Sequence, residues 1–503
     1  MTVIDVPLTT VSRDITVTMG HPFENYQRST ITLQVVSAIT TAVALFVAFR
    51  LTAKIVSVDL IGIWSLVGGL FLVARVSDSG AGNNISRVIA ARVKAAAPLD
   101  LRNLICASIS IACLPSMVVA FILTPAIGTY IGNQYGSQID QSVLRALVWL
   151  GLMNTVILIL SNILLAVCEG VFQLNFKSVT LISSNLIGVL AALPLLSITG
   201  PIGIGLIYNL IAAVQLILAT FRIFKLTRSE PKLRFSRIAL QITYLWRENL
   251  QLSAVSLIRL TFEPATKLFL SFFAPLLLIA QFELAIRVTT QVRVIFQSAL
   301  QPLLAVGARE GKQSSGALRM VFLRNDKVLS RLSLGALVAQ IFAAPAIQVA
   351  GLGTSDIHFT LFFVLLAVGN ALNTMGLSGY YWQLTSGLLY PLLRVQTLMA
   401  GVNLLLGLLA VSLKSPSLVV ASYSTAFAIG GLISRSFLSD LSGLRIVGSV
   451  GAVVAAAGLA TGTIIVASPR SLPSLILFVS FGALIAGLSL YGVRNNFRRG
   501  SVG

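Results

Sequence analysis

Hydrophobic and polar positions alternate along this chain on the scale of whole helices. Apolar runs of about 20 residues, the length that crosses a bilayer as an α-helix, recur between short polar or basic segments. The pattern predicts fourteen transmembrane helices, at residues 30–51, 56–77, 103–127, 143–167, 178–198, 202–223, 249–272, 277–303, 328–350, 358–381, 389–412, 417–437, 446–467 and 472–492. We therefore expect an all-α polytopic membrane protein whose termini lie on one side of the membrane.

Basic residues indicate which side that is. One set of alternate loops is rich in arginine and lysine, and the longest of them carries Arg222, Lys225, Arg228, Lys232, Arg234, Arg237 and Arg247. Loops of the other set hold only Arg50, Lys54, Arg145, Lys414 and Arg470 at their edges. Because positively charged short loops stay in the cytoplasm, we expect both termini inside a bacterial inner membrane.

Charged residues also occur inside the apolar runs, most densely from Leu257 to Gln301. This stretch is hydrophobic enough for two spans, yet it contains Arg259, Glu263, Lys267, Glu283, Arg287 and Arg293. Charges at membrane depth are costly and normally face a bundle interior or a water-filled cavity. Spacings of four place the first three on one helix face, and the same spacing joins Glu283 to Arg287.

Two interpretations of these charges remain open. They line a polar, mainly cationic cavity, or they pair with one another and only hold two helices together. Four cations stand against two carboxylates, so complete pairing leaves a surplus of positive charge. That surplus favours the cavity.

An internal repeat divides the chain. Trp64 and Arg75 align with Phe282 and Arg293, each 218 residues later, and Asn185-Leu186 aligns with Asn403-Leu404 at the same offset. Helices one to six thus resemble helices seven to twelve, and an even number of spans gives both halves the same orientation. We expect two parallel six-helix lobes, related by a pseudo-twofold axis along the membrane normal, and two additional helices.

The domain boundaries follow from the repeat and the basic loops. They are a cytoplasmic tail at 1–28, an N-lobe at 29–223, a basic linker with an interfacial helix at 224–248, a C-lobe at 249–437, and two helices with a basic tail at 438–503.

Composition excludes several function classes. The chain is 56% hydrophobic and only 10% charged, and its net charge of +20 resides in short loops, so nucleic acid is not an expected partner. Cys106, Cys113 and Cys168 lie in apolar runs, and the two histidines are isolated, so we expect no disulfide framework, metal or cofactor. A GxxxxGK[ST] phosphate-binding loop is absent from the sequence.

Two stretches carry a family resemblance. Ile61–Val93 contains a Gly-Xaa-Trp start, an apolar helix and the turn Asp78-Ser79-Gly80-Ala81-Gly82, and Phe282–Glu310 opens with Phe-Glu-Leu-Ala. Both are similar to the polysaccharide-transporter (Wzx-type) flippases of the multidrug/oligosaccharidyl-lipid/polysaccharide exporter (MOP) superfamily. In that family a tyrosine is usual at the place of Phe282.

The resemblance implies a flippase that moves an isoprenoid-diphosphate-linked oligosaccharide across the inner membrane for exopolysaccharide, O-antigen or capsule synthesis. Its partners are then this lipid, the surrounding membrane lipids, a coupling ion, H⁺ or Na⁺, and polysaccharide polymerase or export proteins. Arginine suits the diphosphate because its planar fork binds phosphate oxygens in pairs. The expected substrate-binding residues are Arg259, Lys267, Arg287, Arg293 and Arg75, and the ion-coupling candidates are Glu263, Glu283 and Asp78.

Polar residues on other helices fit sugar hydroxyls or simple helix packing. Examples are Asn373 and Gln396, with Tyr380 as a ring for stacking or a member of an interfacial aromatic belt. Three other functions remain as alternatives. They are a cation-coupled multidrug exporter, which a cationic cavity disfavours, a peptidoglycan-precursor flippase, and a membrane-embedded glycosyltransferase or polymerase.

Overall fold

The computed structural model describes residues 23–75, 100–171, 173–228, 262–310, 315–353, 356–386 and 388–438, with scattered residues at 82–93 and 236–258. Every regular element in these ranges is helical. The first half contains α2 (Phe23–Ile55), α3 (Val58–Leu72), η2 (Val73–Arg75), α5 (Leu101–Tyr135), α6 (Gln141–Gly170), α7 (Leu174–Thr199), η3 (Gly200–Ile202) and α8 (Gly203–Thr227).

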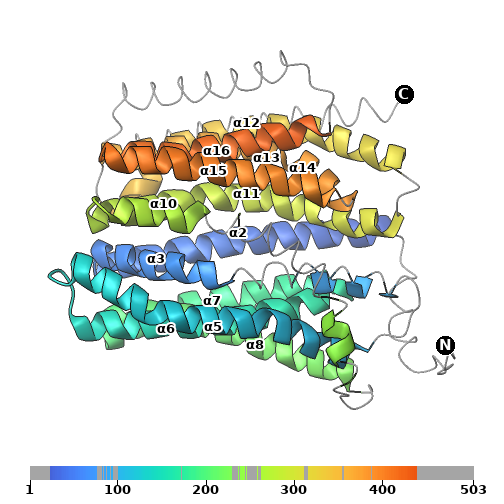
Figure 1. The fold of residues 1–503 in the computed structure, drawn as a ribbon, viewed down its shortest axis with the longest axis horizontal. Coiled ribbons are helices and arrows are strands. Elements are labelled where there is room, and N and C mark those ends of the chain that lie inside the picture. The colour runs from blue at the N-terminus through green and yellow to red at the C-terminus, as the bar shows by residue number, and fades with distance from the viewer. Residues whose placement is uncertain are drawn as a thin grey trace.

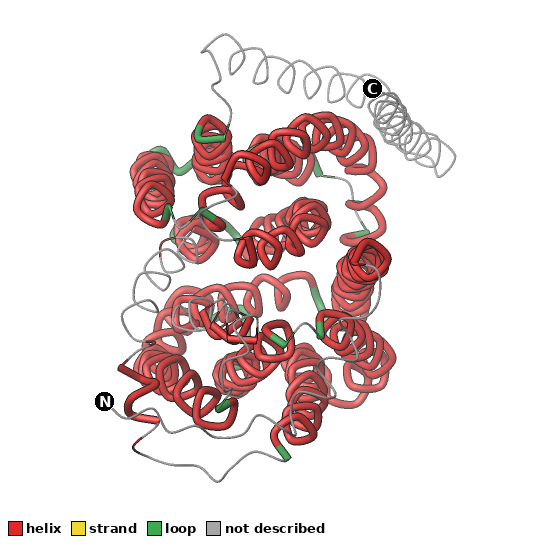
Figure 2. Tube along the Cα trace, turned by 90° about the vertical axis from the view of Figure 1, so that its right-hand side faces the viewer, coloured by secondary structure: helices red, strands yellow, loops and turns green. Residues whose placement is uncertain are grey.

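The second half of the chain is also a series of helices. It contains α10 (Phe262–Ser271), α11 (Leu276–Glu310), α12 (Ser315–Leu352), α13 (Ile357–Met375), α14 (Leu377–Thr385), α15 (Leu389–Ser412) and α16 (Pro416–Ser436). We call α2–α8 the first helix group and α10–α16 the second helix group. Figure 1 shows the two groups side by side, and Figure 2 shows them nearly end-on.

The described residues include nine stretches that are long and apolar enough to cross a membrane. One of them, Leu174–Thr227, contains both α7 and α8 and so covers two predicted spans. The predicted spans at 446–467 and 472–492 lie outside the described residues, as does half of the span at 249–272. The all-helical membrane fold predicted from the sequence is confirmed for the described part of the chain.

One predicted span is divided in two. Instead of a single helix over 358–381, α13 ends at Met375 and α14 begins at Leu377. Gly376 lies at the break, where an added Cβ would be 2.1 Å from the carbonyl oxygen of Gly431 in α16. Two backbones therefore touch at this point, which only glycine permits.

Helix contacts follow one scheme in both groups. In the first group α2 packs on α7, α7 on α8, and α6 on both α5 and α8. In the second group α10 packs on α15, α15 on α16, and α13 on both α12 and α16. The groups meet where α2 and α3 pack against α10 and α11 (Figure 1).

The sequence repeat is visible at this interface. α3 begins at Val58 and α11 begins 218 residues later at Leu276, the offset found in the sequence. Gly62 lets the two helices approach, because an added Cβ would be 2.7 Å from the carbonyl oxygen of Leu276. Repeat-related helices thus lie directly against each other.

Candidate functional site: a charge cluster between the helix groups

The second helix group supplies four charged side chains to the interface. Glu263 lies in the first turn of α10 and Lys267 one turn later, and Glu283 and Arg287 lie one turn apart on α11. Two i,i+4 pairs on neighbouring helices therefore converge on one place.

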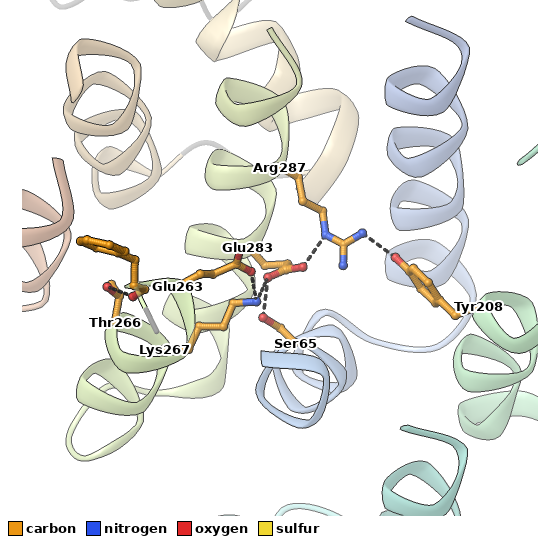
Figure 3. A network of polar contacts seen from close by, with 8 residues as sticks. Ser65, Tyr208, Glu263, Thr266, Lys267, Glu283 and Arg287 are labelled. Carbon is orange, nitrogen blue, oxygen red and sulfur yellow. Dashed lines mark hydrogen bonds and ion pairs between the residues drawn. The ribbon is translucent and has the colours of Figure 1, made fainter. Parts of the chain in front are cut away.

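Lys267 joins the two carboxylates. Its Nζ atom lies 2.5 Å from Oε1 of Glu263 and 2.7 Å from Oε2 of Glu283. The other oxygen of Glu283 accepts a hydrogen bond from Nε of Arg287. These contacts connect all four charges in one chain (Figure 3).

The first helix group completes this network with two hydroxyls. Ser65 of α3 donates a hydrogen bond to Oε2 of Glu283 at 2.6 Å. Nη1 of Arg287 donates to the hydroxyl oxygen of Tyr208, on α8, at 2.6 Å. We call Ser65, Tyr208, Glu263, Lys267, Glu283 and Arg287 the central charge cluster (Figure 3).

Burial differs within the cluster. The side chains of Lys267 and Glu283 are 4% and 3% exposed, whereas those of Glu263 and Arg287 are 35% and 25% exposed. Two carboxylates balance two cations, so the four charged groups have a formal net charge of zero. Pairing, the second of the two interpretations of the sequence, therefore applies to these four residues, and Lys267 is a partner of both Glu263 and Glu283.

A cavity lies against the cluster on the side of the first helix group. We call it the interface cavity. The centre of a water molecule can occupy about 10 Å³ of it, and its lining consists of Ala48, Phe49, Thr52, Ile61, Trp64, Ile204, Ile207, Tyr208, Glu283 and Arg287. The Tyr208 ring lies 5.5 Å from the Trp64 ring and 5.4 Å from the Arg287 guanidinium carbon. The charged ends of Glu283 and Arg287 thus meet an aromatic wall.

Arg293 faces another cavity, inside the second helix group, which we call the second-group cavity. The centre of a water molecule can occupy about 20 Å³ of it, and its lining consists of Phe262, Arg293, Asn373, Gly376, Leu377, Tyr380, Gln396, Met399, Phe427, Gly430, Gly431 and Ser434. The guanidinium carbon of Arg293 lies 5.3 Å from the centre of the Phe427 ring. Arg293 lies six positions after Arg287 on α11, which is about 9 Å along the axis and 240° around it. Arg287 therefore lines the interface cavity, and Arg293 lines the second-group cavity.

The remaining predicted site residues lie elsewhere. Arg75 ends η2, is half-buried, and lines neither cavity. Arg259 and Asp78 lie outside the described residues. Within the described part of the chain, no group of three or more His, Cys, Asp or Glu side chains is arranged to hold a metal ion.

Sequence reasoning missed two polar members of the cluster, Ser65 and Tyr208. For Ser65 the signal was available, because Glu283 is its partner in the repeat, 218 residues later. Repeat-related residues meet at a pseudo-twofold axis, so a buried charge at one position points to its counterpart. Tyr208 gave no such signal, since α8 carries no charged residue before Arg222.

Comparison with known proteins finds similarity to solved structures but not to family models or curated sequences. No family model matches the chain, and neither does any curated protein sequence. Among solved structures, the lipid II flippase MurJ in an inward closed conformation has a TM-score of 0.67 at 12% identity, covering 94% of this chain and 100% of that one.

Two further solved structures are similar to this chain over most of its length. A MOP superfamily transporter from Pyrococcus furiosus has a TM-score of 0.60 at 14% identity, covering 83% of this chain and 98% of its own. A mutant of the Vibrio cholerae MATE transporter VcmN has a TM-score of 0.61 at 14% identity, covering 85% of this chain and 97% of its own. Such identities establish architecture and not substrate. The described helices therefore have the fold of MOP superfamily transporters.

Proposed function

We propose that this protein is a flippase that carries an isoprenoid-diphosphate-linked oligosaccharide from the inner to the outer leaflet of a bacterial inner membrane. The observation that carries the proposal is the position of Arg287. It lies between the two helix groups, on the wall of the interface cavity, half-buried and held by Glu283 and Tyr208. A charge at membrane depth beside a cavity is by default a functional one.

Arg287 suits a diphosphate headgroup. A guanidinium has five N–H donors in a planar fork. The contacts with Glu283 and Tyr208 use two of them, which leaves three for phosphate oxygens. Bidentate, charge-assisted hydrogen bonds of this kind are about twice as strong as neutral ones.

The cluster also suggests how transport and ion flow are coupled. An anionic headgroup on Arg287 competes with Glu283 for the guanidinium. Glu283 would then be left with Lys267 and Ser65 and would more readily take up H⁺ or Na⁺. Glu263 is the second carboxylate available for this role. Binding of one ligand thus changes the affinity for the other, which is the requirement for coupled transport.

Alternating access follows from the same contacts. We propose that the lobes at 29–223 and 249–437 rock about the interface, with the termini on the cytoplasmic side and the lipid tail in the bilayer. Ser65–Glu283 and Tyr208–Arg287 cross this interface, so both hydrogen bonds must break when the groups separate. The chemistry requires no cofactor.

A peptidoglycan-precursor flippase is the second candidate. It is favoured by the match to the lipid II flippase MurJ, which extends over 94% of this chain. Both candidates place a lipid diphosphate on Arg287 and differ in the sugar. A multidrug exporter has weaker support, since the interface cavity exposes an arginine beside a paired carboxylate.

The test measures leaflet exchange in proteoliposomes of the full chain. Three fluorescent probes are compared: an isoprenoid-diphosphate oligosaccharide, lipid II and a cationic dye. We expect the oligosaccharide lipid to be flipped, with a loss of about tenfold or more in Arg287→Ala and partial activity in Arg287→Lys. Arg145→Ala, which removes an exposed arginine from α6, is the matched control and should match the wild type.

Each other outcome has a meaning. Flipping of lipid II alone would replace the first candidate by the second, and transport of the dye alone would refute both. Equal flipping by Arg287→Ala and Arg145→Ala would remove Arg287 from the pathway and leave the cluster a structural one.

A further inference from the structure

The C-terminal end of α8 carries an exposed surface that belongs to neither cavity nor to the central charge cluster. Ile217, Phe221, Phe224 and Arg228 follow one another at intervals of four, three and four, and Lys225 lies one turn after Phe221. They therefore share one face of the helix. All five are exposed, and Ile217, Phe221 and Phe224 are 66%, 71% and 65% exposed. We call these five residues the α8 stripe.

The stripe changes from apolar to basic toward the end of α8. This is the predicted cytoplasmic end, because the loop that follows carries Lys232, Arg234 and Arg237. Apolar side chains at membrane depth contact acyl chains, and a lysine or arginine one turn later extends its charged end to the headgroups. The order of residues along the stripe therefore matches one leaflet of a bilayer.

The charge around the stripe is mainly positive. Neither α7 nor α8 contains an aspartate or a glutamate. At the nearby end of α6, Glu169 is paired with Lys177 at 2.7 Å, so this carboxylate does not neutralise the stripe. Residues 229–237 add three cations and one carboxylate. An anionic headgroup therefore fits this surface better than a zwitterionic one.

Arg222 lies beside the stripe and is held in place by α7. Its Nε atom donates a hydrogen bond to Oε1 of Gln173 at 2.7 Å, and its guanidinium carbon lies 5.7 Å from the centre of the Phe176 ring. Neither partner is a carboxylate, so these contacts fix the guanidinium without cancelling its charge. Arg222 thus adds a third, fixed positive charge next to Lys225 and Arg228.

The corresponding helix of the second group lacks such an exposed cation. α8 and α16 have the same packing partners in their groups, and each has one basic residue in its last turn. Arg435 of α16 is buried and pairs with Asp326 at 3.0 Å, whereas Lys225 of α8 is exposed. The basic end of the stripe is therefore a feature of the first helix group and not a repeat of one scheme in both.

We infer that the α8 stripe binds an anionic phospholipid of the cytoplasmic leaflet. The acyl chains lie on Phe221 and Phe224, the phosphate contacts Lys225 and Arg228, and Arg222 adds positive potential beside the headgroup. Such a lipid attaches the first helix group to one leaflet. The inference goes beyond the proposed function and does not depend on it, because it requires no transported substrate.

Native mass spectrometry of the full chain tests this, with protein released from micelles that contain phosphatidylglycerol and phosphatidylcholine with the same acyl chains. We expect the wild type to bind phosphatidylglycerol more tightly. Lys225→Gln/Arg228→Gln should weaken phosphatidylglycerol binding by about tenfold or more and leave phosphatidylcholine binding unchanged, because only the headgroup contact is lost. Lys225→Arg/Arg228→Lys, which keeps both charges, should retain most of the preference.

Lys54→Gln/Arg145→Gln is the matched control. Both residues are exposed, Lys54 in the last turn of α2 and Arg145 near the start of α6. This variant removes the same charge from the opposite face of the membrane and should bind phosphatidylglycerol like the wild type. Phe221→Ala/Phe224→Ala should weaken both lipids about equally, since the acyl contact does not depend on the headgroup. Circular dichroism confirms folding of each variant.

Three results would overturn the inference. The first is equal binding of the two lipids by the wild type, and the second is equal weakening of phosphatidylglycerol binding by Lys225→Gln/Arg228→Gln and by the control. The third is a loss of isoprenoid-diphosphate binding in Lys225→Gln/Arg228→Gln with phosphatidylglycerol binding unchanged. That result would assign the stripe to the substrate and not to a membrane phospholipid.

Discussion

Replacing Lys267 by methionine tests whether the central charge cluster is held by buried charge. Methionine keeps the unbranched stem, which lies against Gly69, where an added Cβ would be 2.8 Å from Cδ of Lys267. The substitution removes the ammonium that contacts Glu263 and Glu283. The net charge of the four ionised groups then changes from zero to −1.

The magnitude follows from burial. Removing one partner of a buried ion pair costs about 3–5 kcal/mol, because the other charge is left without compensation. Glu283, which is 3% exposed, keeps Arg287 and Ser65, so we expect the lower end, about 3 kcal/mol. Glu263 contributes little to the loss, since its side chain is 35% exposed and water replaces part of the contact.

Lys177→Met is the matched control. Lys177 pairs with Glu169 at 2.7 Å, the same separation as Lys267–Glu283, but the two side chains are 29% and 21% exposed. A pair screened by solvent contributes about 0–1 kcal/mol. The same chemical change at the same distance should therefore cost about 2 kcal/mol less.

The assay is unfolding in mixed detergent micelles, followed by tryptophan fluorescence, with the free energy of unfolding compared between variants. The double variant Lys267→Met/Glu283→Gln should lose less than the sum of its single variants, by about 1–3 kcal/mol. Equal losses for Lys267→Met and Lys177→Met would refute the reasoning, as would strict additivity in the double variant.

Three other contacts predict changes in stability. Gly376→Ala should lower the free energy of unfolding by more than about 3 kcal/mol in the same assay, because its Cβ would lie 2.1 Å from the α16 backbone. Gly68→Ala is the control, because the space around its Cβ is open. It should leave the free energy of unfolding unchanged or raise it by about 0.5–1 kcal/mol. Asp326→Ala should cost about 3–5 kcal/mol and Asp326→Leu less in that assay, since Asp326 is 4% exposed and pairs with Arg435 at 3.0 Å; equal losses would contradict this. The Ser142 amide holds the pKa of the Asp140 carboxyl below its ordinary 3.8, so its stabilisation is present above that pH and lost as pH falls through the lowered value. The difference in melting temperature between wild type and Asp140→Ala should therefore shrink below pH 3.8, and a constant difference would contradict the capping role.

Local sequence determined the helices because a bilayer leaves few choices. A run of about 20 apolar residues must satisfy its own backbone, and a helix does so without help from the rest of the chain. The predicted starts at 143, 389 and 417 lie within two residues of the observed starts of α6, α15 and α16. The break at Gly376 was not predicted, since it depends on the close approach of α16.

The sequence by itself also identified the charged stretch and the repeat offset of 218 residues. Both are properties of residue order, and helical spacing alone gave the Glu283–Arg287 pair correctly. Tertiary structure decided everything that needs two helices to meet. It paired Lys267 with both carboxylates, brought Ser65 and Tyr208 to the cluster, and turned Arg293 toward a different cavity. The physical reason is range: helix periodicity fixes the face on which a side chain lies, whereas packing of distant segments fixes what that face touches.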